Sequence, residues 1–99
     1  MSDRRKSTDI STKSRIAVHD RDGYSCVYCG RSDWGIELAH YISRAQGGLG
    51  IPQNLVSLCV KCHREYDGAE RNEIKPFLEN YLMSAYPDWN ESKLYYRKE

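Results

Sequence analysis

Long apolar runs are missing from this sequence. No stretch approaches the roughly 18 consecutive apolar residues that a membrane-spanning helix requires. The N-terminal residues, MSDRRKSTDIS, also lack the apolar segment of a secretory signal peptide. These two absences predict an intracellular, cytoplasmic protein that has no membrane as a partner.

Phenylalanine is also rare, and the net charge is small. The 99 residues include one Phe against eight Tyr and two Trp, and the formal net charge is +1. The near balance of charges excludes a polybasic protein, and the polar ends of Tyr and Trp favour positions at a surface or groove. A chain of this length forms one domain with a small core, which argues against a large enclosed substrate cavity.

Basic residues gather near the N-terminus, where Arg4, Arg5 and Lys6 are adjacent. We expect residues 1–10 to form a flexible basic arm and residues 11–99 to form a single domain. Within that domain, a core at 24–68 precedes a C-terminal helix and tail at 71–99. On charge alone, a solvated tail explains the arm at least as well as contact with a polyanion.

The cysteines form two Cys-x-x-Cys pairs, Cys26 with Cys29 and Cys59 with Cys62. Without a signal peptide, the expected compartment is reducing and disfavours disulfides. Two such pairs together predict a structural zinc ion held by four thiolates. Gly30 directly after the first pair supports this prediction, because glycine permits the tight turn of a zinc knuckle. Such an ion would compensate for the small core.

Local patterns predict three helices and two strands. Apolar spacing is clearest at 73–85, where Pro76 is expected in the first helical turn. Residues 43–51 contain three glycines and are expected to form no regular element. The predicted helices cover residues 11–21, 61–67 and 73–85; the predicted strands cover 36–42 and 54–58; the polar, Tyr-rich tail covers 89–99.

A group of polar residues lies between and just beyond the two cysteine pairs. His40 is placed at the end of the first strand, and Asn54 is placed where the glycine-rich loop returns. His63 and Asp67 are four residues apart and share one helical face, where they can bind a single divalent ion. Asp67 can alternatively cap or solvate the helix end, and Asn54 can stabilise the loop through side chain–backbone hydrogen bonds.

The pattern resembles the zinc-containing HNH endonucleases. The resemblance runs from about residue 24 to residue 67 and depends on five motifs together. These are C-x-x-C-G, the strand that contains His40, the S-x-x-x-G-G loop, the Asn before L-V-x-L-C, and C-x-x-C-H. It implies an α+β fold with a ββα-metal core, flanked by an N-terminal helix and a C-terminal amphipathic helix.

The resemblance also implies catalytic roles. His40 matches the general base that deprotonates a water molecule attacking a phosphodiester of DNA, and Asn54 matches the residue that stabilises the loop. His63 matches a ligand of the catalytic metal, and Asp67 lies where some members have a further ligand. An imidazole suits the base because its ordinary pKa, about 6.5, leaves it largely neutral at working pH.

One residue departs from the family pattern. The position before the general base is usually an acidic or histidine metal ligand, and here it is Ala39. We expect Asp67 to supply the missing carboxylate, with Glu37 as the fallback. A site of this composition favours Mg²⁺ or Mn²⁺ and also accommodates other transition metals through the imidazole.

Double-stranded DNA is the expected partner. Arg44 beside His40 and the basic N-terminal residues are predicted to contact phosphates, which position a duplex without specifying its sequence. Small HNH proteins of this type are associated with phage or mobile-element machinery. Two alternatives stay open: a non-catalytic, zinc-stabilised DNA-binding module on a degenerate HNH scaffold, and a zinc-ribbon-like protein adapter.

Overall fold

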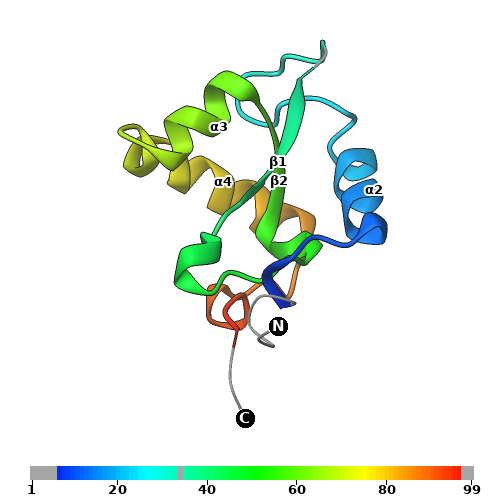
Figure 1. Cartoon of the computed structure of the whole chain (residues 1–99), viewed down its shortest axis with the longest axis vertical. Coiled ribbons are helices and arrows are strands. Elements are labelled where there is room, and N and C mark those ends of the chain that lie inside the picture. The colour runs from blue at the N-terminus through cyan, green and yellow to red at the C-terminus, as the bar shows by residue number, and fades with distance from the viewer. Residues whose placement is uncertain (1–6, 34, 97–99) are drawn as a thin grey trace.

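The structure is a computed structural model that describes residues 7–33 and 35–96. Over these ranges it contains three α-helices and one two-stranded sheet (Figure 1). None of the described helices is long and apolar enough to cross a membrane. The order of the elements is that of an α+β fold with a ββα core, as the sequence predicted. The elements are α2 (Thr12–Arg21), β1 (Ile36–His40), β2 (Leu55–Cys59), α3 (Val60–Asp67) and α4 (Arg71–Ala85), with 3-10 turns at Arg44–Gln46, Pro52–Asn54 and Glu91–Lys93.

Strands β1 and β2 form an antiparallel hairpin, with Ile36 opposite Cys59 and His40 opposite Leu55. All five residues of β2 are buried. Figure 1 shows why, since α2 lies on one side of the hairpin while α3 and α4 lie on the other. A strand covered on both faces needs no polar alternation. The register places the start of α3 beside the beginning of β1 and leaves His40 at the opposite end of that strand.

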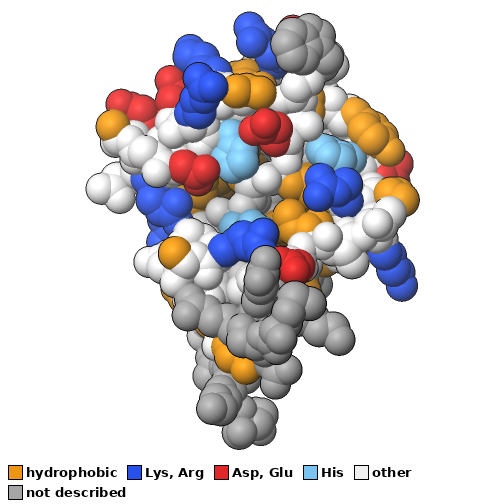
Figure 2. Space-filling view, in the orientation of Figure 1, with side chains coloured by type: hydrophobic (Ala, Val, Ile, Leu, Met, Phe, Trp, Pro, Cys, Tyr) orange, Lys and Arg blue, Asp and Glu red, His pale blue; other side chains and the backbone are white. Residues whose placement is uncertain are grey.

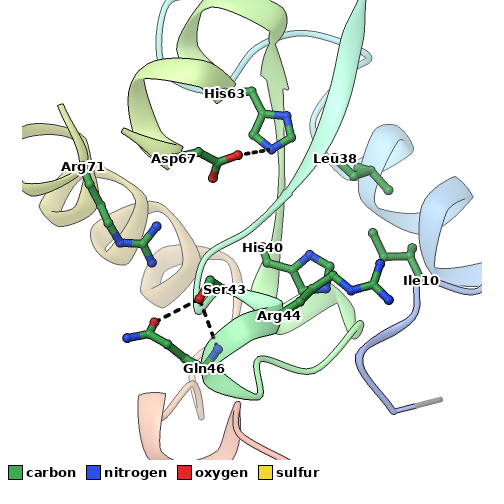
Figure 3. A pocket seen from close by; sticks show the side chains of 9 residues that line it. All are labelled: Ile10, Leu38, His40, Ser43, Arg44, Gln46, His63, Asp67 and Arg71. Atoms are coloured by element: carbon green, nitrogen blue, oxygen red, sulfur yellow. Dashed lines mark hydrogen bonds and ion pairs between the residues drawn. The ribbon is translucent and has the colours of Figure 1, made fainter. Parts of the chain in front are cut away.

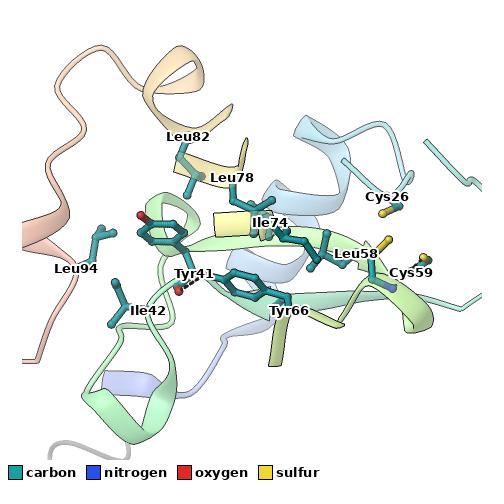
Figure 4. Packing of buried hydrophobic residues seen from close by; sticks show 13 residues of the cluster. Cys26, Tyr41, Ile42, Leu58, Cys59, Tyr66, Ile74, Leu78, Leu82 and Leu94 are labelled. Atoms are coloured by element: carbon teal, nitrogen blue, oxygen red, sulfur yellow. Dashed lines mark hydrogen bonds between the residues drawn. The ribbon is translucent and has the colours of Figure 1, made fainter. Parts of the chain in front are cut away.

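The core lies between the hairpin and α4 (Figure 4). Tyr41 and Tyr66 are almost completely buried there, and the Tyr66 hydroxyl donates a hydrogen bond of 2.6 Å to the Tyr41 carbonyl. Both rings are therefore core residues with their polar ends satisfied, not groove residues. Helix α4 contributes buried aliphatic side chains at the predicted helical spacing: Ile74, Leu78 and Leu82.

Helix α2 is joined to the sheet by the apolar packing of Val18 and by hydrogen bonds from an ion pair at its C-terminal end. The Arg21 Nε and Asp22 Oδ1 atoms are 2.7 Å apart, and the Asp22 side chain is fully buried. Arg21 also donates to the Leu55 carbonyl (2.8 Å), and the Ser57 N–H donates to Asp22 (2.8 Å). This network therefore adds to the packing of Val18, which is the buried residue of this helix.

Several boundaries differ from the prediction. Strand β1 ends at His40 instead of residue 42, because the chain turns there into the connecting loop. That loop contains a 3-10 turn at Arg44–Gln46, where no regular element was expected. Helix α4 begins at Arg71, so Pro76 lies inside the helix and not in its first turn. The helix tolerates Pro76 on its exposed face, where the freed backbone carbonyl can bind water.

The C-terminal residues are packed against the domain as far as residue 96, where a polar tail was expected. Leu94 is 2% exposed, and the Trp89 ring donates a hydrogen bond of 2.8 Å to the Gln53 carbonyl. Tyr95 forms an isolated bridge with Gly48 in the connecting loop. The segment therefore closes one side of the loop that lies between β1 and β2.

The N-terminal segment differs from the prediction in the same way. Residues 1–6 lie outside the described residues, but residues 7–10 contact the domain. Thr8 is only 4% exposed, and the Gly50 N–H donates to the Ser7 carbonyl over 3.0 Å. These four residues are therefore packed, although the sequence placed them in a flexible arm.

Candidate active site and metal centre

The two cysteine pairs meet at one end of the hairpin. The Sγ atoms of Cys26, Cys29, Cys59 and Cys62 all lie within 4.8 Å of one another. In each pair the second backbone N–H points at the first sulfur, with N–Sγ distances of 3.4 Å from Cys29 to Cys26 and 3.5 Å from Cys62 to Cys59. These contacts are typical of zinc knuckles, in which backbone N–H groups stabilise thiolates.

The dimensions of this cluster fit a tetrahedral zinc ion. Zn–S bonds of about 2.3 Å separate two tetrahedral ligands by about 3.8 Å, and the sulfurs of Cys29 and Cys59 are 3.7 Å apart. None of the four cysteines forms a disulfide. Among the described residues, no other group of three or more such side chains is close enough for one ion. His63 lies outside the cluster despite its adjacency to Cys62, as the sequence predicted.

Asn54 connects the two ends of the loop between the strands. Its side chain is completely buried. Its Oδ1 accepts from the Ile42 N–H over 2.8 Å, and its Nδ2 donates to the carbonyls of Ile42 (3.1 Å) and Leu49 (2.9 Å). A buried amide with three backbone hydrogen bonds restrains the loop directly after His40, since leaving any of these groups unpaired is costly.

His40 lies at the end of β1 and is partly buried. Its Nε2 is 2.9 Å from the carbonyl oxygen of Thr8. Because a carbonyl only accepts hydrogen bonds, Nε2 must be the protonated nitrogen, which leaves Nδ1 with a lone pair. Among the described residues, every buried side-chain nitrogen has a hydrogen-bond partner. The Nδ1 atom of His40 has none. Nδ1 is therefore open to solvent and able to accept a proton.

The surroundings of His40 lower its pKa below the ordinary value of 6.5. Burial is the largest cause, because it disfavours the charged ring. The positive charge of Arg44 and the neighbouring His63 act in the same direction, whereas the Thr8 carbonyl and Asp67 oppose the shift. His40 is therefore neutral at neutral pH.

His63 lies in the first half of α3 between two carboxylates. Its Nδ1 is 2.8 Å from Glu37 Oε1 of β1, and its Nε2 is 3.2 Å from Asp67 Oδ2 one helical turn along. The strand register explains the first contact and the four-residue helical spacing explains the second. The sequence ranked Glu37 only as a fallback for Asp67, but both carboxylates contact His63.

The donor set around His63 fits a divalent cation at its Asp67 side. Two adjacent ligands of an octahedral ion with bonds of about 2.1 Å are about 3.0 Å apart, close to the 3.2 Å between Nε2 and Oδ2. Glu37 meets the other ring nitrogen, which is the usual place for a group that orients a ligating histidine. Ala39 is completely buried and offers no donor.

His40, His63 and Asp67 line one open cleft of about 710 Å³. Figure 3 shows His63 and Asp67 projecting from α3 toward the cleft, with His40 across from them at the end of β1. In Figure 2, histidine and acidic side chains gather near the centre of this face, and basic side chains lie around them. The cleft is therefore accessible to a large ligand. Its other lining residues are Ile10, Leu38, Ser43, Arg44, Gln46 and Arg71.

Arg71 is a cleft residue that the sequence analysis missed. It comes from the first turn of α4. Its guanidinium donates to the Tyr41 carbonyl over 3.0 Å and lies 4.4 Å from the centre of the Tyr66 ring. No motif marks this residue, because it reaches the cleft only through the packing of α4 against α3.

The structure brings one of the predicted phosphate-contacting residues to the cleft. Arg44 lines it and forms an ion pair with Asp9. Arg4, Arg5 and Lys6 lie outside the described residues. His40, His63, Asp67 and Arg44 therefore line the cleft, whereas Asn54 is completely buried and restrains the loop that follows His40.

Comparison with known proteins agrees with this geometry. Residues 26–67 match the model of the HNH endonuclease family. The chain is also similar to a curated protein named Anaredoxin from Nostoc sp. (strain PCC 7120), with 29% identity over 58 residues, which cover 59% of this chain and 76% of that relative. The matched family segment begins at the first zinc-knuckle cysteine and ends at Asp67. Residues 26–67, which contain the four cysteines, His40, Asn54, His63 and Asp67, are therefore similar to the HNH endonuclease family.

Proposed function

We propose that this protein is a metal-dependent endonuclease that hydrolyses phosphodiester bonds in double-stranded DNA. The observation that supports this most directly is His40, whose Nε2 is engaged by the Thr8 carbonyl at 2.9 Å. Its free Nδ1 is open to solvent in the cleft that also holds His63 and Asp67. A neutral imidazole with one nitrogen fixed and the other free is the arrangement that a general base requires.

In the proposed reaction, His40 Nδ1 takes a proton from a water molecule as the water oxygen attacks phosphorus. A P–O bond of the backbone breaks, and the leaving oxygen departs with that electron pair. A divalent ion bound by His63 and Asp67 would neutralise the charge that develops on the phosphate oxygens. Asn54 restrains the loop so that His40 keeps its position relative to the scissile phosphate.

The assay that tests the proposal is cleavage of supercoiled plasmid with Mg²⁺ or Mn²⁺. The protein is first freed of loosely bound ions, and its zinc content is measured so that loss of the structural zinc is not mistaken for loss of the catalytic metal. Metal-dependent nicking or linearisation is expected. DNA binding without cleavage under every divalent metal would instead favour the non-catalytic, zinc-stabilised DNA-binding module, for which Ala39 is the main argument.

Asp67 and Glu37 are expected to differ in their effect on the metal. Asp67→Asn should raise the Mg²⁺ or Mn²⁺ concentration needed for half-maximal cleavage by about 10- to 100-fold or more, since it removes a charged oxygen ligand. Glu37→Gln should raise it by less than about tenfold, because the amide oxygen still accepts the His63 Nδ1–H. Metal titrations of the cleavage rate measure both. A larger effect of Glu37→Gln would mean that Glu37 is the ligand.

Arg71 and Arg44 are the cations that we propose for phosphate contacts, because both line the cleft that contains His40 (Figure 3). Arg71 is already oriented by the Tyr41 carbonyl and the Tyr66 ring, so little of its side-chain entropy is lost on binding. These contacts would place the backbone of a duplex across the cleft without selecting its sequence.

Arg71→Ala should weaken DNA binding and reduce its salt dependence. Losing one phosphate contact lowers the slope of log Kd against log salt concentration by about 0.9. Fluorescence anisotropy at several salt concentrations measures this change. Arg64→Ala is the matched control, because Arg64 is an exposed cation of α3 and does not line the cleft. Equal slopes for the wild type and the Arg71 variant would show that Arg71 does not contact DNA phosphates.

A further inference from the structure

Residues 7–10, here called the N-terminal strap, cross the loop between the strands at Gly50. The Gly50 N–H donates to the Ser7 carbonyl over 3.0 Å. A Cβ added to Gly50 would lie 2.1 Å from the carbonyl oxygen of Asp9 and 2.9 Å from that of Thr8. Only a glycine at this position leaves room for the strap.

Three further contacts hold the strap on the domain. Thr8 is 4% exposed, Asp9 forms an ion pair with Arg44, and Ile10 packs against a small cluster formed by Val18, Leu38 and Leu55. The strap is thus joined to the loop, to the cleft edge and to the face of the sheet under α2. It lies outside residues 26–67, the segment that matches the HNH family.

The strap also contacts the proposed general base, since the Thr8 carbonyl lies 2.9 Å from His40 Nε2. We propose that the N-terminal strap is a positioning element of the active site, in which the Thr8 carbonyl keeps His40 in the Nε2–H tautomer and aims Nδ1 into the cleft. This inference rests on the proposed function for its catalytic consequence. The tautomer itself can be tested without any activity.

The two neutral tautomers of imidazole differ little in energy. A single hydrogen bond to a carbonyl is enough to select one of them, by about 3- to 10-fold or more. Without the strap, part of His40 would carry its proton on Nδ1, where it cannot accept one from water. The ring would also be free to rotate out of position.

Gly50→Ala in the full-length chain is the first test, because the methyl group would displace the strap backbone. Long-range ¹H–¹⁵N spectra of the histidine rings, recorded where His40 is neutral, report its tautomer directly. The wild type should show His40 as Nε2–H, and the variant should show a mixture. Its cleavage rate should fall about 10- to 100-fold, the range seen when a partner that orients a functional histidine is lost. Zinc content should stay unchanged.

A second variant covers the case in which Gly50→Ala fails to fold. Cys26 permits ligation of a synthetic segment 1–25 to the remainder of the chain, so the Thr8–Asp9 amide can be replaced by an ester. The ester carbonyl is a weaker acceptor and adds no bulk, so it should shift the same tautomer signal.

The proposal is overturned if wild-type His40 carries its proton on Nδ1, or if both variants keep the wild-type tautomer and rate. A tautomer shift in a protein that cleaves no DNA would support the strap and overturn the nuclease proposal.

Discussion

His40→Ala should lower the rate of DNA cleavage by about 10²- to 10⁴-fold, the usual cost of losing a general base. The side chain is partly buried at the end of β1, and its only hydrogen bond found among the described residues is to the Thr8 carbonyl. Its removal should therefore leave the core, the zinc cluster and DNA binding nearly unchanged. Single-turnover cleavage measures the rate, and anisotropy measures binding.

The pH profile separates this role from a merely structural one. Burial lowers the pKa of His40 below 6.5, so the base stays neutral to lower pH than an ordinary histidine. The acid limb of kcat/KM should lie below pH 6.5, with the rate falling as pH drops through the lowered pKa. His40→Ala should abolish that limb. Near-normal turnover in a folded, zinc-loaded His40→Ala protein would refute the assignment.

Cys29→Ser should unfold or aggregate the protein. Zinc held by four thiolates contributes about 10–16 kcal/mol of apparent binding energy at neutral pH, whereas the whole stability of a domain is about 5–15 kcal/mol. Each sulfur lies within 4.8 Å of the other three, so losing one ligand opens the site. Far-ultraviolet circular dichroism, thermal denaturation and zinc content measure the outcome.

Lys61→Ala is the matched control for this variant. Lys61 lies between Cys59 and Cys62 and is exposed, but it contributes no sulfur. It should keep one zinc ion per chain and the wild-type melting temperature. A Cys29→Ser protein that retains its fold and a cooperative transition without zinc would show that the core alone suffices, against our expectation.

Much of the scaffold could be predicted from the sequence because its signals are local. The spacing of the cysteine pairs predicted the cluster of four sulfurs. The helical apolar pattern predicted α4, whose Ile74, Leu78 and Leu82 are buried. Ser11 was expected to begin the first helix, and its side chain accepts from the Ser14 N–H over 3.1 Å. Boundaries were less certain where the chain turns, as at the end of β1 and the start of α4.

The contacts within the site also differ in whether a local pattern in the sequence predicts them. His63 and Asp67 are four residues apart on one helix, and their contact follows from helical geometry alone. The Glu37 contact with His63 joins residues 26 apart, and the Thr8 contact with His40 joins residues 32 apart. Pairings at such separations depend on strand register and on how the termini pack, which no local pattern encodes.

The sequence by itself determined the four-cysteine cluster, the order of strands and helix, and the proximity of His63 to Asp67. Only the tertiary structure decided that Arg71 reaches this cleft, that Tyr41 and Tyr66 belong to the core, and that the N-terminal strap contacts His40. The physical reason is that ligand spacing and helical periodicity act within a few residues. The free energy that places the strap over Gly50, or Arg71 against the Tyr41 carbonyl, comes from contacts between segments far apart in the sequence. These contacts form only when the chain is folded.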